Sequence, residues 1–104
     1  MQRIFVALLL ACGLLTLADT VFAADVANGE KLARRWCATC HVVATDQRQG
    51  STQAAPFSEV AKQADFDGGK LALFLLAPHP PMPDMSLSRG EAADLAVYIS
   101  RQGK

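Results

Sequence analysis

Two cysteines and a histidine near the middle of the chain are spaced in a way that allows specific chemistry. Cys37, Cys40 and His41 form a C-x-x-C-H sequence. Cysteines three positions apart lie on one side of a helical turn, so both thiols can reach the two vinyl groups on one edge of a porphyrin. The next residue then lies under the ring, where an imidazole nitrogen can bind iron. The pattern is typical of c-type haem attachment, with His41 as an iron ligand.

Three other uses of this cysteine pair are weaker. A thioredoxin-like redox pair needs a βαβ pattern around it, and the flanking sequence here is helical. A structural zinc site needs four ligands, and a second suitable pair is missing from the sequence. A plain disulfide between Cys37 and Cys40 would leave the adjacent histidine unexplained. We therefore predict one covalent haem, with iron as its metal.

The N-terminal segment has the order of a secretory signal peptide. A short positive start (1–3) is followed by an apolar run (4–17), and residues 21–23 end in a small residue. This order predicts cleavage after Ala23. An uncleaved anchor is the alternative, although a membrane helix needs about 20 apolar residues. Cys12 lies in a loosely lipobox-like sequence, so lipidation is a second alternative.

The remaining segment, residues 24–104, is short enough to need stabilisation beyond its own hydrophobic core. Removing 23 residues from 104 leaves 81, and a chain of that size buries only about 60–65% of its surface. Such domains usually depend on a disulfide, a metal or a cofactor. Nine basic and nine acidic residues remain once Arg3 and Asp19 are removed. This balance gives no bulk charge for binding nucleic acid or an anionic membrane, and one domain is expected.

Helical patterns flank the cysteines and end the chain. Asp25 or Asn28 can cap a helix that runs to the cysteines, with Leu32 and Trp36 on its apolar face. Near the C-terminus, Ser88 and Glu91 form a capping box. The helix that follows has one apolar stripe at spacings of three and four, and Gly103 suits its end. The members of the stripe are Ala92, Leu95, Tyr98 and Ile99.

The middle of the chain predicts a loop and two shorter helices. Residues 41–53 are polar and irregular, and a short helix starts around Pro56. Asp67 caps a further helix with residues 70–77 as its body, ended by Pro78. Leu71, Phe74 and Leu75 share one face of that helix, and they are candidates for packing against the haem or for the general core.

Three segments together resemble a small bacterial class I (mono-haem) cytochrome c, and the likeness covers nearly all of residues 24–104. In the first segment, Gly29, Ala33 and Cys37 hold the positions at which that family lets a second helix cross closely. Ala33 is a departure, because the family often has an aromatic residue there. The resemblance implies an all-α fold of about four short helices around one covalently bound haem.

The second segment, around Met82, resembles the family's loop that carries the axial methionine. The resemblance implies Met82 as the sixth iron ligand and Met85 as the apolar residue after it. Met85 and His79 remain alternative ligands. A thioether opposite histidine favours reduced iron and raises the reduction potential. The prolines around Met82 restrict the backbone of the loop.

The third segment, residues 87–99, resembles the family's C-terminal helix. The resemblance implies that Leu95 and Tyr98 cross the first helix near Gly29. In the family, a proline after the haem histidine offers its carbonyl to the other imidazole nitrogen, and Pro56 matches that place. Such a bond would fix the ring of His41. Alternatively, Pro56 only starts a helix.

The family's role implies a periplasmic carrier that moves one electron at a time and is not an enzyme. Its docking face would be the exposed haem edge near Ala38, Thr39 and the loop of Met82. Redox donors and acceptors would dock transiently there, with no nucleic acid and with membrane contact only through membrane-bound partners. Two alternatives are a haem-bearing subunit of a periplasmic dehydrogenase and a haem sensor with a displaceable sixth ligand.

Overall fold

The computed structural model describes residues 23–50, 53–77 and 80–104, and over these residues the regular structure is helical. The four helices of this part of the chain are α2 (Val26–Trp36), α3 (Phe57–Ala61), α4 (Gly68–Leu76) and α5 (Arg89–Arg101). This confirms the expected all-α fold. No helix in the described ranges is long and apolar enough to cross a membrane. Cys12, Pro78, His79 and all but the last residue of the expected signal peptide lie outside the described residues.

The helices start at the residues whose side chains can cap them. Asp25 accepts the amide of the residue three positions on at 3.1 Å and begins α2. Asp67 does the same for α4 at 3.0 Å. At α5 the Ser88 hydroxyl accepts the Glu91 amide at 3.1 Å, and the Glu91 carboxylate accepts the Ser88 amide at 3.0 Å. The predicted caps and capping box are therefore confirmed.

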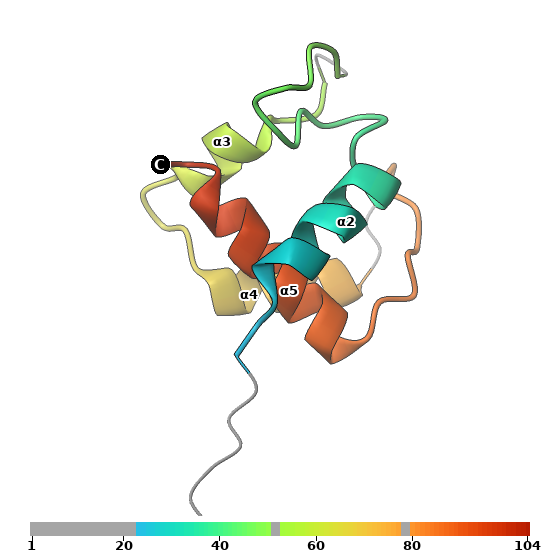
Figure 1. Cartoon of the computed structure of the whole chain (residues 1–104). Coiled ribbons are helices and arrows are strands. Elements are labelled where there is room, and N and C mark those ends of the chain that lie inside the picture. Colours follow the sequence, from blue (N-terminus) through green and yellow to red (C-terminus); the bar gives the residue numbers. More distant parts are fainter. Residues whose placement is uncertain (1–22, 51–52, 78–79) are drawn as a thin grey trace, which may run out of the picture.

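Helices α2 and α5 cross at a glycine, with α4 packed on the far side of α5 (Figure 1). A Cβ added to Gly29 would overlap the backbone carbonyl of Asp94 and lie 2.8 Å from the Cβ of Tyr98. Only a residue without a side chain fits at this approach. Ala33, one turn on, is fully buried, so the small residue fits where the family often has an aromatic one.

The core lies mainly between α2, α5 and the loop that follows the cysteines. The predicted stripe of α5 is buried, and Leu95 at its centre has no exposed surface. Other members of this core come from α2, the loop and α3, namely Leu32, Ala33, Cys37, Val43 and Phe57. Burial of each large apolar side chain contributes about 1.5–3 kcal/mol, so this region supplies much of the stability that the protein atoms provide.

Gly103 follows α5 for a different reason than the expected one. It does not adopt a left-handed backbone conformation. Instead, a Cβ at this position would lie 2.9 Å from the Cβ of Ala61. The glycine therefore allows the end of α5 to approach α3, which is a packing requirement and not a helix-cap requirement.

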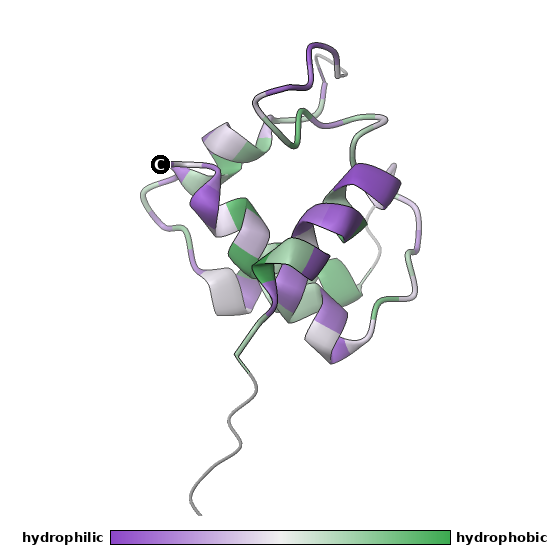
Figure 2. Cartoon of the chain, in the orientation of Figure 1, coloured by the Kyte–Doolittle hydropathy of each residue, from purple (hydrophilic) through white to green (hydrophobic). Residues whose placement is uncertain are grey.

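Helix α4 has an apolar sequence but none of its residues is fully buried. Figure 2 shows hydrophobic colouring toward the C-terminal end of this helix, in contrast to the largely hydrophilic α2. Leu73 is 69% exposed and Phe74 is 49% exposed, while Leu71 and Leu75 are half-buried.

Candidate haem site

The two cysteines and the histidine lie in a tight turn that continues α2. The Cys37 amide donates to the carbonyl of Ala33 at 2.9 Å, so this residue still belongs to the helix end. The amides of Cys40 and His41 both donate to the Cys37 carbonyl, at 3.1 and 2.8 Å. Both thiols are free, with Cys37 buried and Cys40 exposed. The turn therefore presents one thiol toward the core and one at the surface.

Burial determines the protonation of the inner thiol. It raises the pKa of Cys37 to about 11, with a smaller contribution from the neighbouring charge of Cys40. The folded chain thus keeps Cys37 as a neutral thiol at neutral pH, because desolvation disfavours the thiolate.

The imidazole of His41 is fixed in orientation by one hydrogen bond and one ring contact. Its Nδ1 lies 2.6 Å from the carbonyl oxygen of Ala55. A carbonyl can only accept, so Nδ1 carries the hydrogen and Nε2 is left with its lone pair. The ring also lies against Phe57, with centroids 5.3 Å apart and planes tilted by 42°. This arrangement prepares Nε2 as a metal ligand and makes it a better donor.

The carbonyl that binds His41 belongs to Ala55, which corrects the expectation for Pro56. The Pro56 carbonyl accepts the amides of Glu59 and Val60 at 3.0 and 3.1 Å, because Pro56 is the N-cap of α3. An N-cap carbonyl points along its helix and is unavailable to the imidazole. The alternative prediction, in which Pro56 starts a helix, agrees with the structure.

An inner hollow of about 120 Å³ lies beside His41. It is lined by Cys37, His41, Phe57, Val60, Leu71, Phe74, Leu75, Met82 and Ile99. The three α4 residues singled out from the sequence all lie on it. Phe57, Val60 and Ile99 were not anticipated as site residues. Ile99 carried a usable signal, since it belongs to the apolar stripe of α5.

An outer hollow of about 280 Å³ adjoins the inner one at Cys37, His41 and Met82, which line both. Its other lining residues are Trp36, Cys40, Gln53, Ala54, Pro81 and Pro83. None of these side chains is a carboxylate, an ammonium or a guanidinium. The two hollows together form a largely apolar site with both cysteines, the imidazole of His41 and the thioether of Met82 on its walls.

The two methionines of the expected ligand loop have different surroundings. Met82 is half-buried and lines both hollows. Met85 is only 8% exposed and lines neither of them, so it fills the core as an apolar residue would. The structure thus brings Met82 to the same site as His41. His79, the third candidate, lies outside the described residues.

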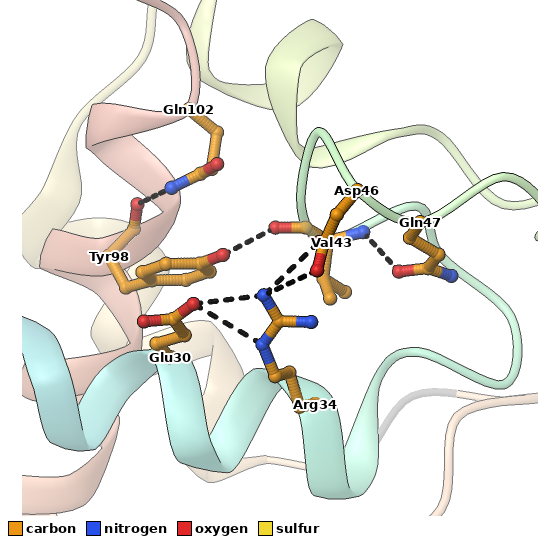
Figure 3. A network of polar contacts seen from close by, with 7 residues as sticks. All are labelled: Glu30, Arg34, Val43, Asp46, Gln47, Tyr98 and Gln102. Carbon is orange, nitrogen blue, oxygen red and sulfur yellow. Dashed lines mark hydrogen bonds and ion pairs between the residues drawn. The ribbon is translucent and has the colours of Figure 1, made fainter.

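The side chain of Gln47 joins the turn at residues 37–41 to the loop that follows it. Its amide nitrogen donates to the carbonyls of Ala38 and His41 at 2.9 and 2.7 Å, and its amide oxygen accepts the Val43 amide at 2.9 Å. Figure 3 shows its bond to Val43. Sequence reasoning missed this residue, because a glutamine within a polar loop gives no periodic or motif signal.

A second set of contacts joins α2, α5 and the same loop (Figure 3). The Tyr98 hydroxyl donates to the carbonyl of Val43 at 2.6 Å, and the bond is buried. Arg34 bridges Glu30 at 3.0 Å and Asp46 at 3.2 Å on the surface. Burial raises the pKa of Tyr98, and the nearby negative charges raise it further.

The donor set fits haem better than a free metal ion. Within the described residues, no group of three or more His, Cys, Asp or Glu side chains could hold a metal. One imidazole and one thioether on an apolar site are a common axial pair for haem iron, and the adjacent thiols match its vinyl edge.

Comparison with known proteins agrees with this geometry. Cytochrome c-552 of Bradyrhizobium diazoefficiens is 52% identical to this chain over 81 residues, which cover 78% of each protein. The chain belongs to the cytochrome c family. The present chain is thus a small bacterial class I cytochrome c. It carries covalently bound haem c with its iron, and it serves as a haem-based electron carrier. No family model and no solved structure matches the chain.

Proposed function

We propose that this cytochrome is a periplasmic electron carrier whose haem is attached at Cys37 and Cys40 and ligated by His41 and Met82. The observation that carries the proposal is that Cys37, His41 and Met82 line both hollows of one apolar site. When bound, the haem supplies an iron that cycles between ferric and ferrous states. The chain's residues attach it, orient it and exclude water from it.

Attachment needs two thiols that each add across one vinyl group. The sulfur forms a new bond to carbon and the thiol hydrogen goes to the neighbouring carbon, so there is no leaving group. Cys37 keeps its hydrogen at neutral pH because burial raises its pKa to about 11. Cys40 is exposed, which puts its thioether at the surface of the finished site.

The two proposed iron ligands, His41 and Met82, would set the range of the reduction potential. The Nδ1 bond from His41 to Ala55 holds the ring and strengthens Nε2 as a donor. The Met82 thioether is a soft neutral ligand that favours ferrous iron. Leu71, Phe74 and Leu75 give the inner hollow an apolar wall, and a low dielectric disfavours the extra positive charge of the ferric form.

The surface around the outer hollow suits transient docking of redox donors and acceptors. Thr39 and Cys40 are exposed, as are Pro81 and Pro83. The Arg35 guanidinium lies 4.9 Å from the centroid of the Trp36 ring, and none of the lining side chains is itself charged. Partners would therefore bind through apolar contact, with association rates that change little with salt.

The N-terminal segment directs the chain to the periplasm in this proposal. Residues 1–23 act as a signal peptide that is removed after Ala23, which leaves residues 24–104 as the cytochrome domain in the periplasm. The protein carries electrons and does not transform a substrate, since His41 and Met82 would both bind the iron and leave it no open site for a substrate.

Absorption spectra of the purified protein, oxidised and reduced, test the ligand assignment. We expect the weak long-wavelength band of methionine-ligated ferric haem, its loss in Met82→Ala and its retention in Met85→Ala. The reduced native protein should not bind carbon monoxide at neutral pH. If Met82→Ala keeps the band, or if the native protein binds carbon monoxide, the proposed ligation is wrong and a sensor becomes the better interpretation.

A further inference from the structure

The side chain of Gln47 contacts the backbone of His41, the residue proposed as an iron ligand. Its amide nitrogen lies 2.7 Å from the carbonyl oxygen of His41 and 2.9 Å from that of Ala38. The same nitrogen donates to the carbonyl of Gln49 at 2.8 Å, and the amide oxygen accepts the Val43 amide at 2.9 Å. One half-buried side chain therefore binds four backbone groups, two of them within the C-x-x-C-H turn.

The peptide group between His41 and Val42 is held by several contacts. A Cβ added to Gly50 would lie 3.1 Å from the carbonyl carbon of His41 and 3.1 Å from the amide nitrogen of Val42, so the backbone of Gly50 lies against this peptide group. The Gln47 amide binds its carbonyl oxygen at 2.7 Å. On the other side of the same residue, the His41 amide donates to the Cys37 carbonyl at 2.8 Å. These contacts restrict the rotation of the His41 backbone.

The orientation of the imidazole depends on that backbone. Nδ1 of His41 lies 2.6 Å from the carbonyl oxygen of Ala55, across the loop that Gln47 anchors. The far end of this loop is held by the Phe57 amide, which donates to the Val42 carbonyl at 3.0 Å. A rotation of the His41 peptide group would move the ring relative to Ala55 and lengthen the Nδ1 bond. The strength of this bond determines how well Nε2 donates to iron.

We propose that Gln47 is a positioning residue for the iron ligand, which keeps the Nδ1 bond of His41 short and thereby lowers the reduction potential of this cytochrome. The inference rests on the proposed ligation by His41. A strong Nδ1 bond makes the imidazole a better electron donor, and a better donor stabilises ferric iron more than ferrous iron. Gln47 lines neither the inner nor the outer hollow. Its effect on the iron therefore passes through the backbone of His41.

The test compares Gln47→Ala with Tyr98→Phe in the haem-loaded protein. Tyr98 donates to the Val43 carbonyl at 2.6 Å, so both substitutions remove bonds to the same loop without changing the net charge at neutral pH. Neither side chain lines the two hollows, and only Gln47 binds the backbone of His41. We expect Gln47→Ala to raise the reduction potential and Tyr98→Phe to leave it at the native value. Gln47→Met keeps the length of the side chain without its amide, and it should raise the potential as Gln47→Ala does.

The Nδ1 hydrogen of His41 gives a second readout, which a general loss of stability would not reproduce. Nuclear magnetic resonance of the ferrous protein follows the exchange of this hydrogen with solvent. We expect clearly faster exchange in Gln47→Ala than in Tyr98→Phe, because a longer bond to Ala55 protects the hydrogen less.

Four results would overturn the proposal. The potential of Gln47→Ala could equal that of the native protein, or it could fall, which would indicate that water reaches the iron. Gln47→Met could keep the native potential, which would assign the effect to side-chain packing. The methionine band could disappear in Gln47→Ala, which would place the effect at Met82. Each of these results counts against Gln47 alone when the native protein keeps its haem mass after denaturation. A native protein without covalent haem would overturn this inference and the proposed function together.

Discussion

The two sides of α5 differ in how they are completed. On the α2 side, Leu95 and Ala33 are fully buried, and Gly29 lets the helices touch. On the α4 side, a helix of more apolar sequence has no fully buried residue, and Leu73 is 69% exposed. The difference shows that protein atoms form the core of the α2 side, and we propose that haem completes the core of the α4 side against Leu71, Phe74 and Leu75, which line the inner hollow.

The largest expected effect comes from one substitution made on both sides. Leu95→Ala should lower the free energy of unfolding of the haem-loaded protein by about 4 kcal/mol, because it opens a cavity in a filled core. Leu73→Ala should change it by less than about 0.5 kcal/mol, since this side chain is mostly exposed. Urea unfolding followed by circular dichroism measures both values. Equal losses of unfolding free energy in the two variants would contradict the difference between the two sides of α5.

Gly29→Ala tests the closeness of the helix crossing. The added methyl group would overlap Asp94 and force α2 from α5, so we expect a loss of about 3 kcal/mol in urea unfolding. Gly90→Ala is the matched control. At that position the nearest atom, Ser88 Oγ, lies 3.9 Å from the new Cβ, and the change should stabilise the helix by about 0.5–1 kcal/mol. A tolerated alanine at Gly29 would show that the crossing is looser than described.

Tyr98→Phe removes the buried bond to the Val43 carbonyl and should cost about 2 kcal/mol, because the carbonyl loses its partner. The pH dependence follows from the raised pKa of Tyr98. The unfolded chain releases this proton near pH 10 and the folded one only above it. Its contribution is therefore complete below pH 10 and is lost as the pH rises through the folded value. Thermal melts from pH 8 upward should show a shallower alkaline decline in Tyr98→Phe, and identical slopes would refute this assignment.

The smallest expected effect concerns the loop beside the haem-binding turn. Gln47→Ala removes four side-chain bonds to backbone groups and should cost about 1.5 kcal/mol. The Val43 amide should then exchange its hydrogen faster. Gln49→Ala, which alters an exposed neighbouring side chain, should change stability by less than about 0.5 kcal/mol. If both variants behave alike, the side chain of Gln47 does not organise the loop.

Much of the fold was predictable because its signals are local. The caps at Asp25, Asp67 and Ser88 depend on residues three positions apart, and the stripe of α5 depends on helical periodicity. The apolar face of α4 that lines the inner hollow was predicted in the same way. Local patterns of this kind survive folding because no distant contact is needed to create them.

The missed features depend on where loops run in space. The carbonyl that meets His41 belongs to Ala55 and not to Pro56, a difference of one residue that only the path of the loop decides. The bonds of Gln47 go to backbone groups, which carry no sequence signal. The close approach of Gly103 to Ala61 joins residues 42 positions apart, and nothing local to either residue indicates it.

The central claim is that one haem is bound covalently through Cys37 and Cys40, and the mass of the denatured protein tests it most directly. The protein would be purified from cells able to attach haem, unfolded, and compared with Cys37→Ser, Cys40→Ser and the double variant. We predict the mass of residues 24–104 plus one haem for the native chain, and no retained haem in the double variant. A native chain that leaves its haem behind on unfolding would contradict the account.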